Sequence, residues 1–146
     1  MNLAVIGSGG REHAICYKLK QSPKIKKLVC VPGNAVTQEI AENIKEDISN
    51  FDALYQIIKK QNIDLVVVGP EQPLVEGLVD YLNEKKIRVF GPDKFSSQLE
   101  GSKAFMKNLC KKNNIPTANF GVFNNYNDAS NFIKKNGVPI VVKADG

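Results

Sequence analysis

The sequence predicts an α/β fold with a doubly wound, mainly parallel sheet. Short apolar runs rich in β-branched residues alternate with longer segments whose apolar residues recur at helical spacing. Continuous apolar strands of this kind suit a parallel sheet that helices cover on both faces. Glycine- and proline-containing turns follow these runs. At 146 residues the chain has about the size of one ordinary α/β domain and can bury a core.

The elements up to about Phe90 account for this sheet. We expect its strands at Leu3–Ile6, Leu28–Val31, Leu65–Val68 and Ile87–Phe90. Three segments between them each place apolar residues on one helical face: first Ile15, Cys16 and Leu19; then Phe51, Leu54, Tyr55 and Ile58; then Val75, Leu78, Val79 and Leu82. Residues 1–98 are therefore predicted to form one domain.

Beyond Pro92 the pattern changes, and we expect a second, truncated unit over residues 99–146. Ser102 is placed as the N-cap of a helix whose apolar face holds Phe105, Met106, Leu109 and Cys110. A strand-like run at 119–123, a helix carrying Ala129, Phe132 and Ile133, and a strand at 139–143 follow. About fifty residues offer little core, so we expect this unit to depend on the first one or to be marginally stable.

Composition limits the class of protein. Hydrophobic residues make up 42% and charged residues 24%, which is typical of a globular chain. No apolar run approaches the ~20 residues of a membrane span, and the N-terminus lacks the basic start of a signal peptide. The three cysteines are widely spaced in apolar patterns, which favours buried thiols over disulfides or metal ligands. The net charge of +5 is spread over helix faces without interleaved aromatics, so we do not expect binding to nucleic acid. Together with the lack of a membrane span and a signal peptide, the composition leads us to expect a cytoplasmic protein that does not bind membranes.

The first turn is the strongest local motif. Gly7-Ser8-Gly9-Gly10 follows an apolar strand and leads into Arg11-Glu12-His13-Ala14 at a helix start. Glycines there let backbone N–H groups approach an anion at the positive end of the helix. A dinucleotide site is disfavoured, because Glu12 stands where the third fingerprint glycine belongs and the next strand ends in Pro-Gly-Asn rather than an acidic residue. A tight turn without a ligand is the plain alternative.

Special turns follow four predicted strands: Gly7–Gly10, Pro32–Ala35, Gly69–Leu74 and Gly91–Pro92. Ligands of open α/β sheets bind outside the carboxyl ends of the strands, so these turns are expected to converge on one rim. Glu71 lies between two prolines, and a carboxylate in such a rigid loop can accept hydrogen bonds from ligand hydroxyls. The rim is the predicted ligand site.

Together these motifs resemble one family. Gly-Ser-Gly-Gly-Arg-Glu-His-Ala at 7–14, Pro-Gly-Asn-Ala at 32–35, Val-Gly-Pro-Glu-Gln-Pro-Leu at 68–74, Phe-Gly-Pro at 90–92, Leu-Glu-Gly-Ser-Lys at 99–103 and Val-Val-Lys-Ala-Asp-Gly at 141–146 occur in the order found in glycinamide ribonucleotide synthetases. The resemblance covers essentially the whole chain, but only the N-terminal third of the family's usual length. It implies a Rossmann-like pre-ATP-grasp domain over 1–98, followed by the beginning of an ATP-grasp domain.

Members of this family are phosphoribosylamine-glycine ligases of purine synthesis. They use ATP with Mg²⁺ or Mn²⁺ to convert glycine to an acyl phosphate, which the amine of 5-phosphoribosylamine attacks to give glycinamide ribonucleotide. The resemblance implies that the intact protein is such an enzyme and works as a monomer. It also implies that this chain alone is inactive, since the family carries its acidic metal ligands further along and no metal site is expected within these residues.

The resemblance also implies roles for individual residues. Gly9, Gly10, Arg11, Glu12, Asn34 and Glu71 would line the phosphoribosylamine pocket, with the glycine-loop amides facing the phosphoribosyl end and Glu71 accepting from ribose hydroxyls. Lys103 and Lys143 match the two lysines that approach ATP phosphates. No residue of the chain is expected to be a catalytic nucleophile or base, and His13 is expected to make a helix-capping or structural hydrogen bond.

Two other classes of function stay open from the residues alone. A Rossmann-type oxidoreductase module would bind a nicotinamide dinucleotide at the glycine loop. A noncatalytic phosphosugar-binding domain would keep the rim but have no use for Lys103 and Lys143.

Overall fold

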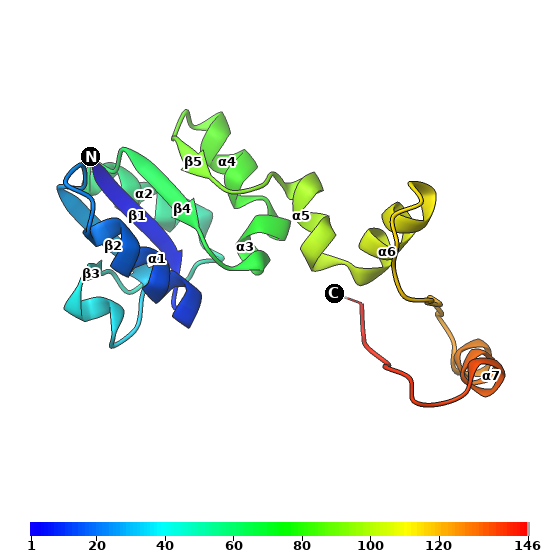
Figure 1. Ribbon diagram of the computed structural model, residues 1–146. Coiled ribbons are helices and arrows are strands. Elements are labelled where there is room, and N and C mark those ends of the chain that lie inside the picture. Colours follow the sequence, from blue (N-terminus) through cyan, green and yellow to red (C-terminus); the bar gives the residue numbers. More distant parts are fainter. Residues whose placement is uncertain (146) are drawn as a thin grey trace. The chain divides into compact units, whose positions relative to one another are not determined.

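The computed structural model describes residues 1–145, which form two compact units, Met1–Ser97 and a second that begins at Gln98 (Figure 1). The first unit contains a five-stranded sheet in the order β3-β2-β1-β4-β5, and every neighbouring pair is parallel. Its strands are β1 (Asn2–Gly7), β2 (Lys27–Pro32), β3 (Glu42–Asn43), β4 (Leu65–Val68) and β5 (Val89–Phe90). The doubly wound parallel sheet predicted from the sequence is confirmed.

The order in which successive strands are added to the sheet reverses at β1. The chain runs outward from the central β1 to β2 and β3, then returns to pair β4 on the other side of β1. Val5 consequently pairs with both Cys30 of β2 and Val67 of β4. Such a switch point is where open α/β sheets leave a crevice for ligands.

Helices connect the strands. The structure has α1 (Gly10–Lys20), the 3₁₀ turn η1 (Thr37–Glu39), α2 (Phe51–Lys60), α3 (Glu71–Glu76), α4 (Leu78–Glu84), α5 (Lys94–Gly101), α6 (Lys103–Lys112) and α7 (Tyr126–Asn136). The stripe from Val75 to Leu82, which predicted a single helix, is divided by Gly77. Its φ of 102° is the left-handed conformation that ends α3 and that glycine adopts without a steric penalty.

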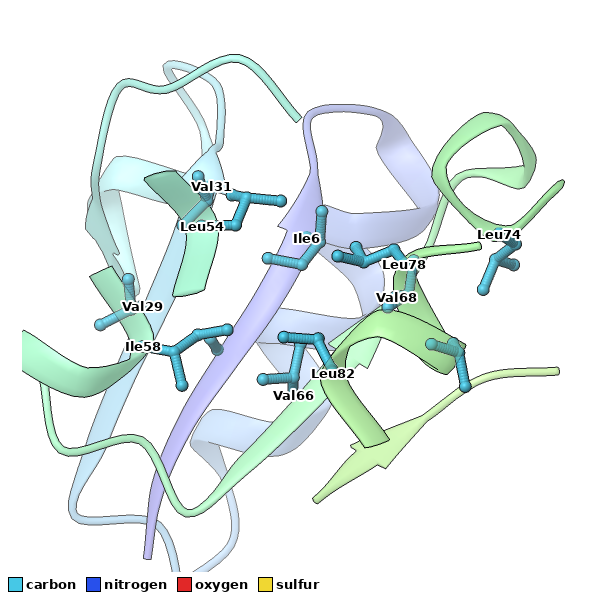
Figure 2. Close-up of a cluster of buried hydrophobic side chains, with 12 residues drawn as sticks. Ile6, Val29, Val31, Leu54, Ile58, Val66, Val68, Leu74, Leu78 and Leu82 are labelled. Atoms are coloured by element: carbon cyan, nitrogen blue, oxygen red, sulfur yellow. The ribbon is translucent and has the colours of Figure 1, made fainter. Parts of the chain in front are cut away.

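The core lies on both faces of the sheet. On one face, Leu54 and Ile58 of α2 and Leu78 and Leu82 of α4 pack against strand residues (Figure 2). The strand side of this cluster includes Ile6, Val29, Val31, Val66 and Val68. On the other face, Cys16 of α1 packs with Leu3, Val5, Leu28 and Cys30. Alternate residues of β1 thus serve opposite layers, which explains why its sequence is apolar throughout.

The second unit has little interior. No residue from Gln98 to Asp145 is buried. Ser102 caps α6 as predicted, since its hydroxyl accepts a hydrogen bond from the Phe105 N–H at 3.0 Å. The strands predicted at 119–123 and 139–143 are wrong, because both segments are irregular. A strand needs a neighbour for its backbone hydrogen bonds, and neither segment has one among residues 1–145.

Strand β5 is also shorter than expected. Only Val89–Phe90 of the predicted Ile87–Phe90 pairs with β4, and it lies at the edge of the sheet. Within residues 1–145, no helix is long and apolar enough to cross a membrane.

Candidate functional site

The loops after the strands meet at the carboxyl edge of the sheet. The Gly33 N–H donates to the Gly7 carbonyl, and the Gly69 N–H donates to the Ile6 carbonyl, each at 3.1 Å. These bonds join the loop after β2 and the loop after β4 to the end of β1. A Cβ atom added to Gly91, after β5, would lie 2.9 Å from Leu74 of α3, so this turn packs against the helix that follows β4. The predicted convergence of these turns is confirmed.

Glu12 lies at the centre of this arrangement. It occupies the third position of α1, and only 3% of its surface is exposed. Its Oε2 accepts a hydrogen bond from the Gly9 N–H at 2.7 Å, and its Oε1 accepts one from Nε of Arg11 at 3.2 Å. The carboxylate therefore satisfies the N–H group of the residue that caps α1 and holds the neighbouring guanidinium.

The glycines around Glu12 leave room for its side chain. A Cβ atom at Gly7 would lie 2.6 Å from Cγ of Glu12, and one at Gly9 would lie 2.9 Å from Oε2. A Cβ atom at Gly69 would overlap Oε1. Gly10 differs, because nothing lies within 4 Å of its added Cβ. Three of the rim glycines are thus required by an internal side chain, while Gly10 faces open space.

Arg11, at the start of α1, pairs with Glu71, at the start of α3. Its NH2 group lies 3.1 Å from Oε2 of Glu71, and both side chains are 56% exposed. Glu71 is the first residue of α3, so its expected place within a loop is wrong, although Pro70 does form the N-cap that precedes it. The Glu71 backbone N–H and then Arg11 lower the pKa of the Glu71 carboxyl below its ordinary value. Glu71 and Glu12 in turn raise the pKa of Arg11.

Asn34 ties the loop after β2 to the glycine loop. Its Nδ2 donates to the Ser8 carbonyl at 2.7 Å, and its Oδ1 accepts from the N–H groups of Val36 and Thr37, each at 2.9 Å. Both ends of the Asn34 amide are therefore used within the protein. Asn34 therefore lies at the rim as predicted, and its side chain holds the loop after β2 against the glycine loop.

Sequence reasoning missed two residues that support Asn34. Thr37 is fully buried, and its hydroxyl accepts from the Asn34 N–H at 2.7 Å. The Asn43 side chain donates to the Asn34 carbonyl at 2.7 Å. The spacing of Asn34 and Thr37 is a turn-capping pattern that could have identified the first contact. No local pattern predicts Asn43, because it comes from the neighbouring strand β3.

His13 does not make the structural hydrogen bond expected of it. Its imidazole has no hydrogen-bond partner among residues 1–145, and its backbone N–H donates to the Gly9 carbonyl at 3.1 Å. Its side chain is half-buried on α1.

The two predicted ATP-binding lysines lie in the second unit, and both are exposed. Lys103 is the first residue of α6. Asp145, two residues after Lys143, accepts hydrogen bonds from the Ala104 N–H at 3.0 Å and from the Ser102 hydroxyl at 2.9 Å. These donors lower the pKa of Asp145 and bring the segment that carries Lys143 to the start of α6. Gly146, the last residue of the predicted motif, lies outside the described residues.

Among residues 1–145, neither the cysteines nor groups of potential metal ligands form a site. All three cysteines are free; Cys16 and Cys30 are buried as predicted, whereas Cys110 is half-buried on α6. In the part of the chain that the structure describes, no three His, Cys, Asp or Glu side chains are grouped so that they could hold a metal ion.

Comparison with known proteins places this geometry in context. Residues 1–100 match the family model described as phosphoribosylglycinamide synthetase, N domain, and residues 101–146 match that of the ATP-grasp (A) domain of the same synthetase. A phosphoribosylamine-glycine ligase of Brucella melitensis is 51% identical over 146 residues, which are the whole of this chain and 34% of that protein. Its counterpart in Mesorhizobium japonicum is 49% identical over the same length. The chain spans about a third of the length of these curated relatives.

Solved structures agree with these matches. The crystal structure of phosphoribosylamine-glycine ligase from Thermotoga maritima aligns with a TM-score of 0.68 at 30% identity, covering 92% of this chain and 30% of that one. A biotin carboxylase domain of a single-chain bacterial carboxylase aligns with a TM-score of 0.70 at 15% identity, covering 100% of this chain and 37% of that one. The second likeness shows a shared fold alone.

Proposed function

The chain belongs to the phosphoribosylglycinamide synthetase family, and from this premise we propose that it is the N-terminal part of an ATP-dependent ligase that joins glycine to 5-phosphoribosylamine in purine biosynthesis. In this proposal residues 1–98 form the substrate domain and residues 99–146 begin the ATP-grasp domain. The intact enzyme would use ATP and a divalent metal, Mg²⁺ or Mn²⁺, and would work as a cytoplasmic monomer. The chain alone would not complete the reaction.

The observation that carries this proposal is the Arg11–Glu71 pair, which joins the start of α1, after β1, to the start of α3, after β4, next to the open space at Gly10. Both side chains are accessible, so a ligand at the switch point of the sheet can reach them. The Glu71 carboxyl, whose pKa is lowered by its own backbone N–H and by Arg11, can accept hydrogen bonds from the hydroxyls of a ribose. The backbone at Gly9 and Gly10 would lie against the same ligand.

Glu12 and Asn34 would complete the phosphoribosylamine site by holding its loops in place. Their polar atoms are bonded to loop backbone or to Arg11, so they would hold the rim in the shape that the ligand meets. A preformed rim costs less ordering entropy on binding. It would also keep the reactive amine in one orientation, which is the main requirement when a bound amine attacks an activated carboxyl group.

Lys103 and Lys143 fit a role with ATP. Each carries an exposed ammonium group, and Asp145 brings their segments together at the start of α6. Bound ATP supplies the phosphoryl group that activates the glycine carboxylate. The two ammonium groups would hold its phosphates and offset their charge.

An amide-resolved NMR titration with glycinamide ribonucleotide tests the substrate site. We expect saturable shifts of the Gly10 and Glu71 amides, and none with NAD. The Glu71→Gln variant should weaken glycinamide ribonucleotide binding about tenfold, by removing a charge-assisted hydrogen bond of roughly 1.5 kcal/mol, while keeping the wild-type spectrum elsewhere. Unchanged affinity in Glu71→Gln would exclude the role of this carboxylate, and shifts with NAD alone would overturn the proposed function.

A further inference from the structure

Glu12 occupies the place that a bound anion takes in other glycine loops. A loop between a strand and a helix binds phosphate through backbone N–H groups at the helix start. Here the Gly9 N–H already donates to Oε2 of Glu12 at 2.7 Å. The acceptor is part of the same helix, so this N–H is satisfied before any ligand arrives.

The side chain of Glu12 also fills the volume of the loop. Added Cβ atoms at Gly7 and Gly9 would lie 2.6 Å and 2.9 Å from Glu12 atoms, and one at Gly69 would overlap its carboxylate. Only 3% of Glu12 is exposed. The space that three glycines open between β1 and β4 therefore contains a side chain and has no room for a phosphate group.

The charges around Arg11 also disfavour a phosphate group in this loop. The guanidinium of Arg11 contacts two carboxylates, Glu12 at 3.2 Å and Glu71 at 3.1 Å. These three side chains together carry one net negative charge. The positive charge of Arg11 is therefore already compensated. A phosphate group beside Arg11 would lie close to the carboxylates of Glu12 and Glu71 and would be repelled by them.

We propose that Glu12 is a specificity-determining residue: its carboxylate excludes phosphate from the β1–α1 loop, so that the rim takes hydroxyl and amine groups of a ligand. This inference rests on the proposed function only for the identity of the ligand, a phosphosugar amine. Its ribose hydroxyls and amine meet Glu71 and Gly10, and its phosphate lies away from the Gly9 N–H. The same carboxylate rejects the pyrophosphate of a dinucleotide, which explains in physical terms how this glycine loop differs from a dinucleotide site.

Pyrophosphate is the probe that tests the proposal on the full 146-residue chain. We expect the Gly9 amide resonance of the wild-type protein to show no saturable shift with pyrophosphate. In Glu12→Ala, which removes both the acceptor and the bulk, saturable shifts at Gly9 and Gly10 are expected. The control is Glu84→Ala, which removes an equal charge at the exposed end of α4 and should behave as the wild type.

Each outcome of the pyrophosphate titrations either supports or overturns the proposed role of Glu12. A saturable Gly9 shift in the wild-type protein overturns the proposal without any variant, and so does a folded Glu12→Ala protein that gains no pyrophosphate binding. If Glu12→Ala does not fold, Glu12→Ser keeps a small hydrogen-bonding side chain and removes the carboxylate with most of its bulk. It should show saturable pyrophosphate shifts at Gly9, and a folded Glu12→Ser protein without them overturns the proposal.

A parallel titration with glycinamide ribonucleotide separates this inference from the proposed function. If the ribonucleotide does not bind but pyrophosphate behaves as expected, the proposed function fails and the role of Glu12 stands. If the ribonucleotide binds at the rim and pyrophosphate also enters the wild-type loop, the role of Glu12 fails and the proposed function stands.

Discussion

Replacement of Gly7 by alanine tests the packing of the glycine loop most directly. Gly7 is buried at the end of β1 with a φ of 126°, a conformation that costs a residue with a Cβ roughly 1–3 kcal/mol. The new methyl group would lie 2.6 Å from Cγ of Glu12. Because Glu12 is buried and held at both carboxylate oxygens, it has little freedom to move away, and forced overlap in a packed site costs about 1–3 kcal/mol.

These two terms are opposed by the lower entropy of the unfolded alanine chain, worth about 0.4–1 kcal/mol. The Gly7→Ala variant should therefore lose about 3 kcal/mol of unfolding free energy, which is a large fraction of the ~5–15 kcal/mol of a typical domain. Urea denaturation followed at the Val5 and Val66 amide resonances measures this change in the first unit alone.

Gly10→Ala is the matched control, since nothing lies within 4 Å of its added Cβ and it begins α1. Alanine there should change the stability by less than about 1 kcal/mol, in the stabilising direction. Equal effects of the two substitutions would refute the packing argument. Combining Gly7→Ala with Glu12→Ala should cost less than the sum of the single changes, because the added methyl group then enters vacated space.

The remaining predictions concern the Arg11–Glu71 pair and the start of α6. Glu71 has a lowered pKa when folded, so its stabilising contribution is present above the ordinary pKa of about 4.3 and is lost as the pH falls through the folded value. A ¹³C titration of its carboxyl carbon should give a midpoint below 4.3 in the wild type and a higher one in Arg11→Ala; identical midpoints would contradict the ion pair. Glu71→Ala, which removes only the exposed partner of Arg11, should alter the unfolding free energy by no more than about 1 kcal/mol in urea denaturation, because both side chains of the pair are 56% exposed. Ser102→Ala removes the N-cap of α6 and should destabilise that helix by about 1 kcal/mol, seen as roughly fivefold faster amide exchange; Asn108→Ala, exposed in the same helix, should not accelerate exchange, and equal acceleration in both would argue against the cap.

Features that depend on short stretches of sequence were predictable. The apolar runs of β1, β2 and β4 identified the parallel sheet, and the Ser102 cap was visible from its position before an apolar helical stripe. The convergence of the turns also followed, because parallel strands place their carboxyl ends at one edge. Each of these inferences uses periodicity or topology alone.

Features that depend on distant partners were not predictable. The run at 139–143 has strand-like residues, but without a neighbouring strand among residues 1–145 it stays irregular. Asn43 supports Asn34 only because β3 lies next to β2. The apolar pattern from Val75 to Leu82 continues at helical spacing past Gly77, but in the structure Gly77 caps the end of α3.

The sequence by itself determined the parallel sheet of β1, β2, β4 and β5, the family, and the convergence of the turns at the rim, because each is encoded in local motifs and their order. Only the tertiary structure decided what the rim residues do. Glu12 is a surface-type residue in the sequence, yet the approach of the β4 turn to β1 buries it among three glycines. The physical reason is that the two donors to its carboxylate, the Gly9 N–H and the Arg11 side chain, are local to the start of α1, whereas its burial also needs Gly69, which lies beside the end of β1 only once β1 and β4 have paired.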